Sequence, residues 1–266
     1  MFASAFFKNS KFLVAPLALA LVGFAAKSTP TVHAAGPSGV KNILLVHGAW
    51  ADGSSWNKVI TKLHDDGYNV TAVQLPLTSL ADDVAVVQRA LAREDGKTLL
   101  VGHSYGGVVI TEAGVDPKVA GLVYVAAFAP DAGESALSLT KTGPATPIGA
   151  DLVPDAAGFL KLSAAGVAAD FAQDLSPAEQ TEIAATQGPL SAPNAFSANV
   201  THVAWKNLPS WYVVAANDRA IGPVLEATMA KRINATTLTL QSSHVVMLSH
   251  PTEVSNFVEK AASSLK

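Results

Sequence analysis

Short runs of apolar residues recur along this chain and alternate with segments whose apolar residues fall three or four positions apart. The apolar runs are residues 43–46, 69–75, 98–101, 119–127, 211–216 and 236–240. Such runs are typical of strands buried on both faces, and the spacing between them is typical of amphipathic helices. The alternation predicts an α/β fold with a mostly parallel, doubly wound sheet.

The alternation stops at Pro130 and resumes after about Asn207. Residues 131–207 are rich in Ala, Pro, Gly and Ser, with short helices expected at 163–171 and 176–186 and a small strand at 159–162. About 75 residues are too many for an ordinary connection. Phe171, Phe196 and Trp205 argue against a disordered linker. We therefore expect a mainly helical cap inserted into a single domain that spans residues 35–266.

The N-terminus has the layout of a secretory signal peptide. Lys8 and Lys11 precede an apolar run over residues 12–26, and Val32-His33-Ala34 offers a small-residue cleavage site, with cleavage after Ala26 or Ala35 as the alternatives. The run is shorter than the roughly 20 residues that a membrane-spanning helix needs. Residues 1–34 are therefore predicted to be cleaved, which implies export to the periplasm or beyond without a stable membrane anchor.

Composition excludes several functions. The net charge is −3, and three of the 18 basic residues lie in the predicted signal peptide, so nucleic acid is not an expected partner. The chain has no cysteine, which excludes disulfides, thiolate metal sites and cysteine catalysis. Oligomeric state stays open.

The strand candidate 98–101 leads into Gly102-His103-Ser104-Tyr105-Gly106, which matches the G-x-S-x-G pattern. Between a strand and a helix this pattern is a nucleophile elbow, a strained turn that presents a serine hydroxyl above a sheet. The alternative is a glycine-rich helix start or an anion-binding loop. The choice depends on whether the chain supplies a base, a residue that orients the base, and oxyanion donors.

Two later strand ends supply the first two partners. His244 follows the last strand directly and is the candidate base, and Asp218 follows the preceding strand and is the candidate orienting carboxylate. Their order, Ser, Asp, His, is that of hydrolases with this elbow. Asp131 is the alternative carboxylate.

The loop after the first strand, His47-Gly48-Ala49-Trp50, is the candidate oxyanion loop. We expect the backbone N–H groups of Ala49 and Tyr105 to hold the oxyanion, and His47 to have a structural role within the loop. Trp50 and Phe128 are candidates for the substrate pocket. This chemistry requires no metal and no cofactor.

Together these segments resemble the α/β-hydrolase superfamily, and within it the branch of plant methylesterases, hydroxynitrile lyases and their bacterial relatives. The segments that carry the resemblance are residues 47–50, 102–107, 217–221 and 243–251. Lyases of this branch have a threonine in the oxyanion loop and a lysine after the catalytic histidine. This chain has Gly48 and Val245 at the matching positions, so it resembles the esterases.

The expected function is hydrolysis of a small-molecule carboxylic ester by Ser104, His244 and Asp218 through an acyl-enzyme. Three alternatives stay open: a non-catalytic ligand-binding protein on the same fold, a lyase-like or haloperoxidase-like activity, and acyl transfer to an alcohol other than water. Substrate identity depends on how residues 131–207 fold over the serine.

Overall fold

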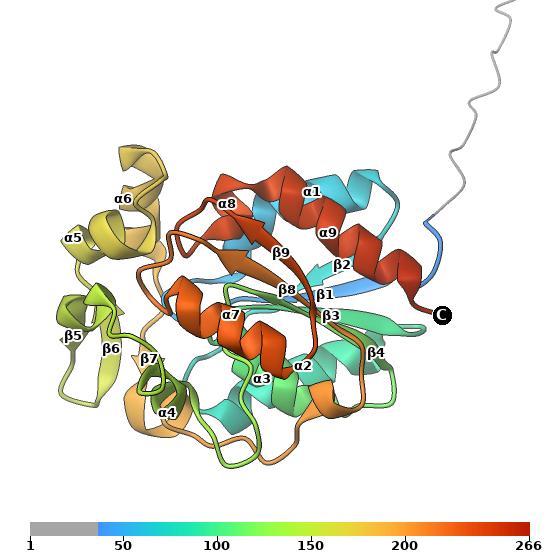
Figure 1. The fold of residues 1–266 in the computed structure, drawn as a ribbon, viewed down its shortest axis with the longest axis horizontal. Coiled ribbons are helices and arrows are strands. Elements are labelled where there is room, and N and C mark those ends of the chain that lie inside the picture. The colour runs from blue at the N-terminus through green and yellow to red at the C-terminus, as the bar shows by residue number, and fades with distance from the viewer. Residues whose placement is uncertain (1–36) are drawn as a thin grey trace, which may run out of the picture. The chain divides into compact units, whose positions relative to one another are not determined.

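The computed structural model describes residues 37–266, so the predicted signal peptide and its cleavage site lie outside the described residues. A six-stranded sheet forms the centre, in the order β2-β1-β3-β4-β8-β9 with every neighbouring pair parallel (Figure 1). The strands are β1 (Asn42–Val46), β2 (Asn69–Ala72), β3 (Thr98–His103), β4 (Val119–Val125), β8 (Ser210–Ala215) and β9 (Thr236–Leu240). The prediction of an α/β fold with a parallel, doubly wound sheet is confirmed.

Helices cover both faces of the sheet (Figure 1). Helices α1 and α9 lie on one face, and α2 and α3 lie on the other. The bounds of the helices around the sheet are α1 (Asn57–Asp65), α2 (Leu80–Arg93), α3 (Gly106–Ala113), α7 (Pro223–Arg232), α8 (Val246–Ser249) and α9 (Pro251–Ser264), with the 3-10 helix η1 (Gly53–Trp56) before α1. This cover leaves β1, β3 and β8 buried along their whole length, whereas the edge strands β2 and β9 are partly exposed.

The second strand is shorter than the run 69–75 predicted. Strand β2 ends at Ala72, and only Val73 N–H continues toward β1, to the carbonyl of Leu45 at 3.0 Å. The backbone N–H of Leu75 donates to His47 Nε2 at 2.9 Å, so a side chain takes the place of the strand ladder.

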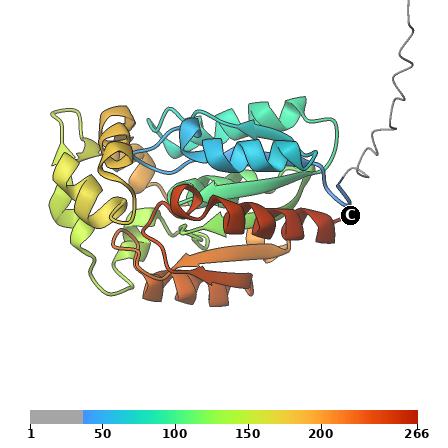
Figure 2. The same cartoon turned by 90° about the horizontal axis from the view of Figure 1, so that it is seen from above.

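Residues 131–207, called the cap below, lie between β4 and β8 and combine short helices with a small sheet. Figures 1 and 2 place most of them together at the carboxyl ends of the main strands, whereas the last element, η5 (Ala204–Lys206), packs against α3. Their elements are α4 (Ala136–Thr140), η2 (Pro147–Asp151), β5 (Leu152–Pro154), β6 (Phe159–Leu162), α5 (Ala164–Gly166), η3 (Val167–Phe171), α6 (Pro177–Thr186), β7 (Leu190–Ser191), η4 (Ala192–Phe196) and η5 (Ala204–Lys206). Strands β5, β6 and β7 pair antiparallel. Only β6 was predicted, because two or three residues give no readable alternation.

Across residues 37–266, no helix is both long and apolar enough to cross a membrane. The same residues contain no group of three or more His, Asp or Glu side chains arranged to hold a metal ion.

Candidate active site

Ser104 occupies the sharp turn between β3 and α3. Its φ is +53°, a left-handed conformation that costs a non-glycine residue energy and that a nucleophile elbow requires. Gly106 permits the turn, because a Cβ there would lie 2.6 Å from the carbonyl oxygen of Val46. The backbone N–H of Phe128 donates to the Ser104 carbonyl at 3.1 Å and ties the turn to the segment after β4. The elbow predicted from the sequence is therefore present.

Asp218 and His244 meet at the carboxyl ends of β8 and β9. His244 Nδ1 lies 2.6 Å from Asp218 Oδ2, and both side chains are buried. The other carboxylate oxygen, Oδ1, accepts the backbone N–H groups of Ala220 at 2.5 Å and Ile221 at 3.0 Å. With Nδ1 donating to the carboxylate, the proton is absent from Nε2, which is the state a general base needs.

Electrostatics keep Asp218 ionised. Burial alone would raise the pKa of Asp218, but the charge and hydrogen bond of His244, together with further hydrogen bonds, outweigh it, so the pKa lies well below its usual value. The alternative carboxylate, Asp131, forms an ion pair with Lys206 in a partly exposed position. Asp218, not Asp131, is the partner of His244.

His244 Nε2 is buried and has no hydrogen-bond partner within residues 37–266. The bond between Ser104 Oγ and His244 Nε2 is therefore not formed, as is common in serine hydrolases before substrate binds. The segments that carry Ser104 and His244 are nonetheless in contact. His103, which precedes the serine, has its Nε2 3.0 Å from the His244 carbonyl and its ring 4.7 Å from the His244 ring.

The two other histidines around the serine are neutral. Burial lowers the pKa of His103 well below its usual value, and His103 Nε2–H donates to the His244 carbonyl. Burial also lowers the pKa of His47, whose Nε2 accepts from Leu75 N–H while Nδ1–H donates to the Gly48 carbonyl at 2.8 Å. The predicted structural role of His47 is confirmed.

Ala49 and Tyr105, whose backbone N–H groups are the predicted oxyanion donors, line the same cavity as Ser104. Across the described part of the chain, neither backbone N–H donates to a protein acceptor. Both donors are therefore available to an oxyanion.

The cavity has a volume of about 300 Å³, and the predicted pocket residues Trp50 and Phe128 both line it. Its remaining walls are mostly apolar and come from the cap and the loop after Asp218: Leu137, Ile148, Leu152, Leu160, Phe196 and Ile221. The Trp50 indole N–H donates to the Leu160 carbonyl at 2.9 Å, which joins the oxyanion loop to the cap.

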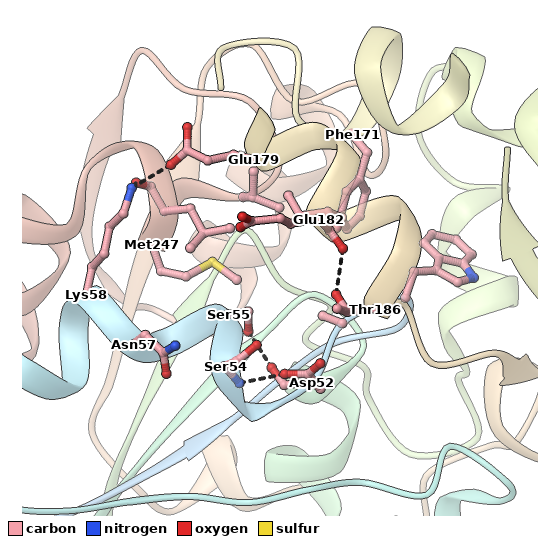
Figure 3. A pocket seen from close by; sticks show the side chains of 15 residues that line it. Asp52, Ser54, Ser55, Asn57, Lys58, Phe171, Glu179, Glu182, Thr186 and Met247 are labelled. Atoms are coloured by element: carbon pink, nitrogen blue, oxygen red, sulfur yellow. Dashed lines mark hydrogen bonds and ion pairs between the residues drawn. The ribbon is translucent and has the colours of Figure 1, made fainter. Parts of the chain in front are cut away.

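A second cavity of about 300 Å³, which Trp50 also lines, lies between α1 and the cap helix α6 (Figure 3). Met247, Glu182 and Phe171 extend toward its centre, and the Lys58–Glu179 ion pair, 2.8 Å long, spans its rim. Phe171 packs edge-on against Trp50 and also contacts the His244 ring, with centroid distances of 6.0 Å and 5.1 Å. The ring pair of Trp50 and Phe171 thus stands at this second cavity, whereas Ser104 lines the first.

Two contacts beside the site were missed by the sequence analysis. The Tyr105 hydroxyl donates to the buried Asp83 Oδ2 at 2.9 Å, and Asp83 Oδ1 accepts Leu77 N–H at 2.9 Å. Burial raises the pKa of Asp83 to about 6. The sequence did hold one sign that Asp83 is buried, because it falls on the apolar stripe of its helix, between Leu80 and Val87.

The second missed contact comes from the cap. Asp174 Oδ2 accepts the backbone N–H of Ser243 at 2.8 Å and the hydroxyl of Ser242 at 3.2 Å, immediately before His244. No local sequence pattern predicts this contact, because Asp174 lies 69 and 68 residues from its two partners.

Comparison with known proteins agrees with this fold and geometry. Residues 43–257 match the alpha/beta hydrolase family, so the chain belongs to that family. The chain is similar to the alpha/beta hydrolase nvfD of Aspergillus novofumigatus, with 27% identity over 83% of this chain and 96% of that protein. It is also similar to methylesterase 7 of Arabidopsis thaliana, with 37% identity over 34% of this chain and 41% of that one. Among solved structures, a pyrethroid hydrolase from Sphingobium faniae superposes with a TM-score of 0.72 at 25% identity, covering 85% of this chain and 98% of that one.

Proposed function

We propose that this protein is a serine esterase that hydrolyses small carboxylic esters. The observation that carries the proposal is the hydrogen-bonded Asp218–His244 pair beside a strained serine in an apolar cavity. Relatives whose names describe ester hydrolysis, such as methylesterase 7, support the same chemistry.

In the proposed reaction His244 Nε2 takes the Ser104 hydroxyl proton as Oγ attacks the ester carbonyl. The N–H groups of Ala49 and Tyr105 hold the resulting oxyanion. The protonated His244, stabilised by Asp218, then gives its proton to the departing alcohol and leaves an acyl-enzyme on Ser104. A water molecule, deprotonated by the same histidine, attacks the acyl-enzyme and releases the acid.

The test is hydrolysis of a short-chain nitrophenyl ester by the purified protein. Wild type should turn over many equivalents, and Ser104→Ala should lose nearly all activity. Ser54→Ala, which changes a serine beside the second cavity, is the matched control and should behave like wild type. Equal rates for wild type and Ser104→Ala would show that Ser104 is not the nucleophile.

The alternative functions predict different outcomes when the hydrolysis assay is combined with a fluorophosphonate label or with an added alcohol. A non-catalytic binding protein would be labelled by a fluorophosphonate without multiple turnover, and an acyltransferase would give more ester product than acid when an alcohol is added. A lyase of this branch needs a positive charge after the catalytic histidine, but Val245 is apolar and buried. Haloperoxidase-like activity uses the same residues and is expected only as a side reaction.

We also propose that the protein is exported and that residues 1–34 are removed. The charged start, the short apolar run and the Val32-His33-Ala34 site support this proposal. N-terminal sequencing of the protein recovered from a periplasmic fraction or from culture medium should begin at Ala35. A start at Met1 would contradict it.

A further inference from the structure

Glu226 lies behind the Asp218–His244 pair, in the first turn of α7. Its side chain has no solvent exposure. Fully buried glutamates are rare unless they are paired. One oxygen, Oε2, accepts the backbone N–H of Ala215 at 2.9 Å, at the end of the strand that leads to Asp218. The side chain is therefore fixed at the base of the loop that carries the candidate orienting carboxylate.

The second oxygen of Glu226, Oε1, is also buried, and no donor reaches it within the described residues. Its neighbour is the Asp218 carboxyl group, which is close enough for the two groups to shift each other's pKa. Two carboxyl groups can hydrogen-bond to each other only when one of them carries a proton. A proton on one member of the pair would therefore give the unpaired Oε1 its missing partner.

The surroundings decide which carboxyl group holds that proton. Asp218 accepts hydrogen bonds from Ala220 N–H, Ile221 N–H and His244, and these favour its anion. Glu226 accepts one backbone N–H and faces a negative charge. Burial, followed by the charge of Asp218, raises the pKa of Glu226 well above its usual value. The proton belongs on Glu226.

We propose that Glu226 is a positioning residue of this site and that its protonated carboxyl group donates a hydrogen bond from Oε1 to Asp218. The inference rests on the proposed function, in which Asp218 orients His244. The hydrogen bond holds the Asp218 carboxylate in place while Ala215 N–H holds Glu226. It also withdraws part of the Asp218 charge from His244. The other titratable groups that face this pair are His244 and Tyr212, whose hydroxyl donates to the Ala127 carbonyl.

The decisive variant is Glu226→Gln. A glutamine amide donates to Asp218 through Nε2 and still accepts Ala215 N–H through Oε1, so it reproduces a protonated glutamate. We expect kcat/KM within about threefold of wild type and an unchanged pH profile. If Glu226 were ionised, glutamine would remove a negative charge behind Asp218, and the acid limb of the profile would move to lower pH. That shift would overturn the proposal.

Glu226→Leu removes the donor. We expect kcat to fall by about ten- to a hundredfold with KM little changed, because a hydrogen bond to a charged group is lost. The acid limb of kcat/KM should move to higher pH, because Asp218 then presents its full charge to the protonated His244. A merely structural defect would lower activity without this shift. Wild-type kinetics and an unmoved profile for Glu226→Leu would refute the positioning role.

Glu259→Gln is the matched control. Glu259 also has a buried, unpaired Oε1 and also has an aspartate, Asp66, as the neighbour that shifts its pKa, but it lies on α9. This variant should keep wild-type activity and the wild-type pH profile.

Infrared difference spectroscopy of the full protein at neutral pH separates failure of this inference from failure of the proposed function. The difference spectrum of wild type minus Glu226→Gln should contain the carbonyl band of a protonated carboxylic acid, whether or not the protein hydrolyses esters. This readout also serves if Glu226→Leu does not fold. Absence of the band from this difference spectrum would overturn the proposal even if esterase activity were found.

Discussion

Asp174 accepts the backbone N–H of Ser243 at 2.8 Å, so a cap residue fastens the segment that carries His244. Phe171, three residues earlier in the cap, packs against the His244 ring. The cap therefore does more than enclose the cavity, because it also holds the candidate base in position.

Asp174→Ala should lower kcat about tenfold or more, with a smaller effect on KM, because small displacements of a base are costly. Asp174→Asn should retain more activity, since its Oδ1 still accepts Ser243 N–H. Steady-state kinetics on a nitrophenyl ester measure both. The control is Asp170→Asn, which changes a nearby cap carboxylate paired with Arg219. Wild-type kinetics in Asp174→Ala would show that the cap contact does not position His244.

Gly48→Ala should nearly abolish activity. A Cβ at this position would lie 2.6 Å from Ser104 Cβ and 2.9 Å from the His103 carbonyl oxygen, so either the oxyanion loop or the elbow must move. Loss of one aligned oxyanion donor costs roughly a hundredfold in kcat, and we expect at least that loss. Gly96→Ala, where the nearest atom is 3.7 Å from the added Cβ, should be neutral. If the Gly48→Ala variant were active and had an unchanged melting temperature, a Cβ at this position would not displace the oxyanion loop or the elbow.

Asp83 should make stability fall as pH rises. Burial raises the pKa of Asp83 from 3.8 to about 6, so its contribution to stability is complete below 3.8 and is lost as pH rises through 6. Asp83→Asn removes this titration while keeping an acceptor for Leu77 N–H. The unfolding free energy of wild type relative to the variant should fall by about 2 kcal/mol between about pH 4.5 and about pH 8. Urea melts at both values test this, and a constant difference would show that Asp83 does not titrate as described.

Trp50 should set the size limit of the substrate, because its ring lines both cavities. Trp50→Ala should raise kcat/KM for bulky esters relative to acetate esters by about tenfold. Trp50→Phe keeps a ring but loses the hydrogen bond to the Leu160 carbonyl, so it should cost about 1 kcal/mol of stability with little change in preference. An ester series measured on both variants distinguishes them. If wild type, Trp50→Ala and Trp50→Phe all had the same preference among esters, Trp50 would not limit the size of the substrate.

Local patterns were sufficient for the sheet and for the positions of Ser104, Asp218 and His244. Each of these residues follows an apolar run that forms a strand. The carboxyl ends of parallel strands lie at one edge of the sheet, so the sequence predicted that the three side chains would lie close together. The donors at Ala49 and Tyr105 followed from the same reasoning.

Contacts between distant segments could not be predicted in this way. Asp174, Asp83 and Glu226 have buried or cap partners whose identity depends on how helices and cap pack on the sheet. Asp83 and Glu226 did leave one readable sign, because each is an acid among the buried positions of a helix. The end of β2 was misplaced because a histidine side chain, not a strand, satisfies Leu75.

Phe128 separates two tasks within one residue. Its backbone N–H secures Ser104, while its side chain forms part of the cavity wall. Replacing the side chain therefore changes what fits beside the serine and leaves the backbone hydrogen bond intact, with proline the exception because it lacks the N–H. Position 128 is therefore a place where the choice of substrate can be redesigned separately from the geometry of the serine.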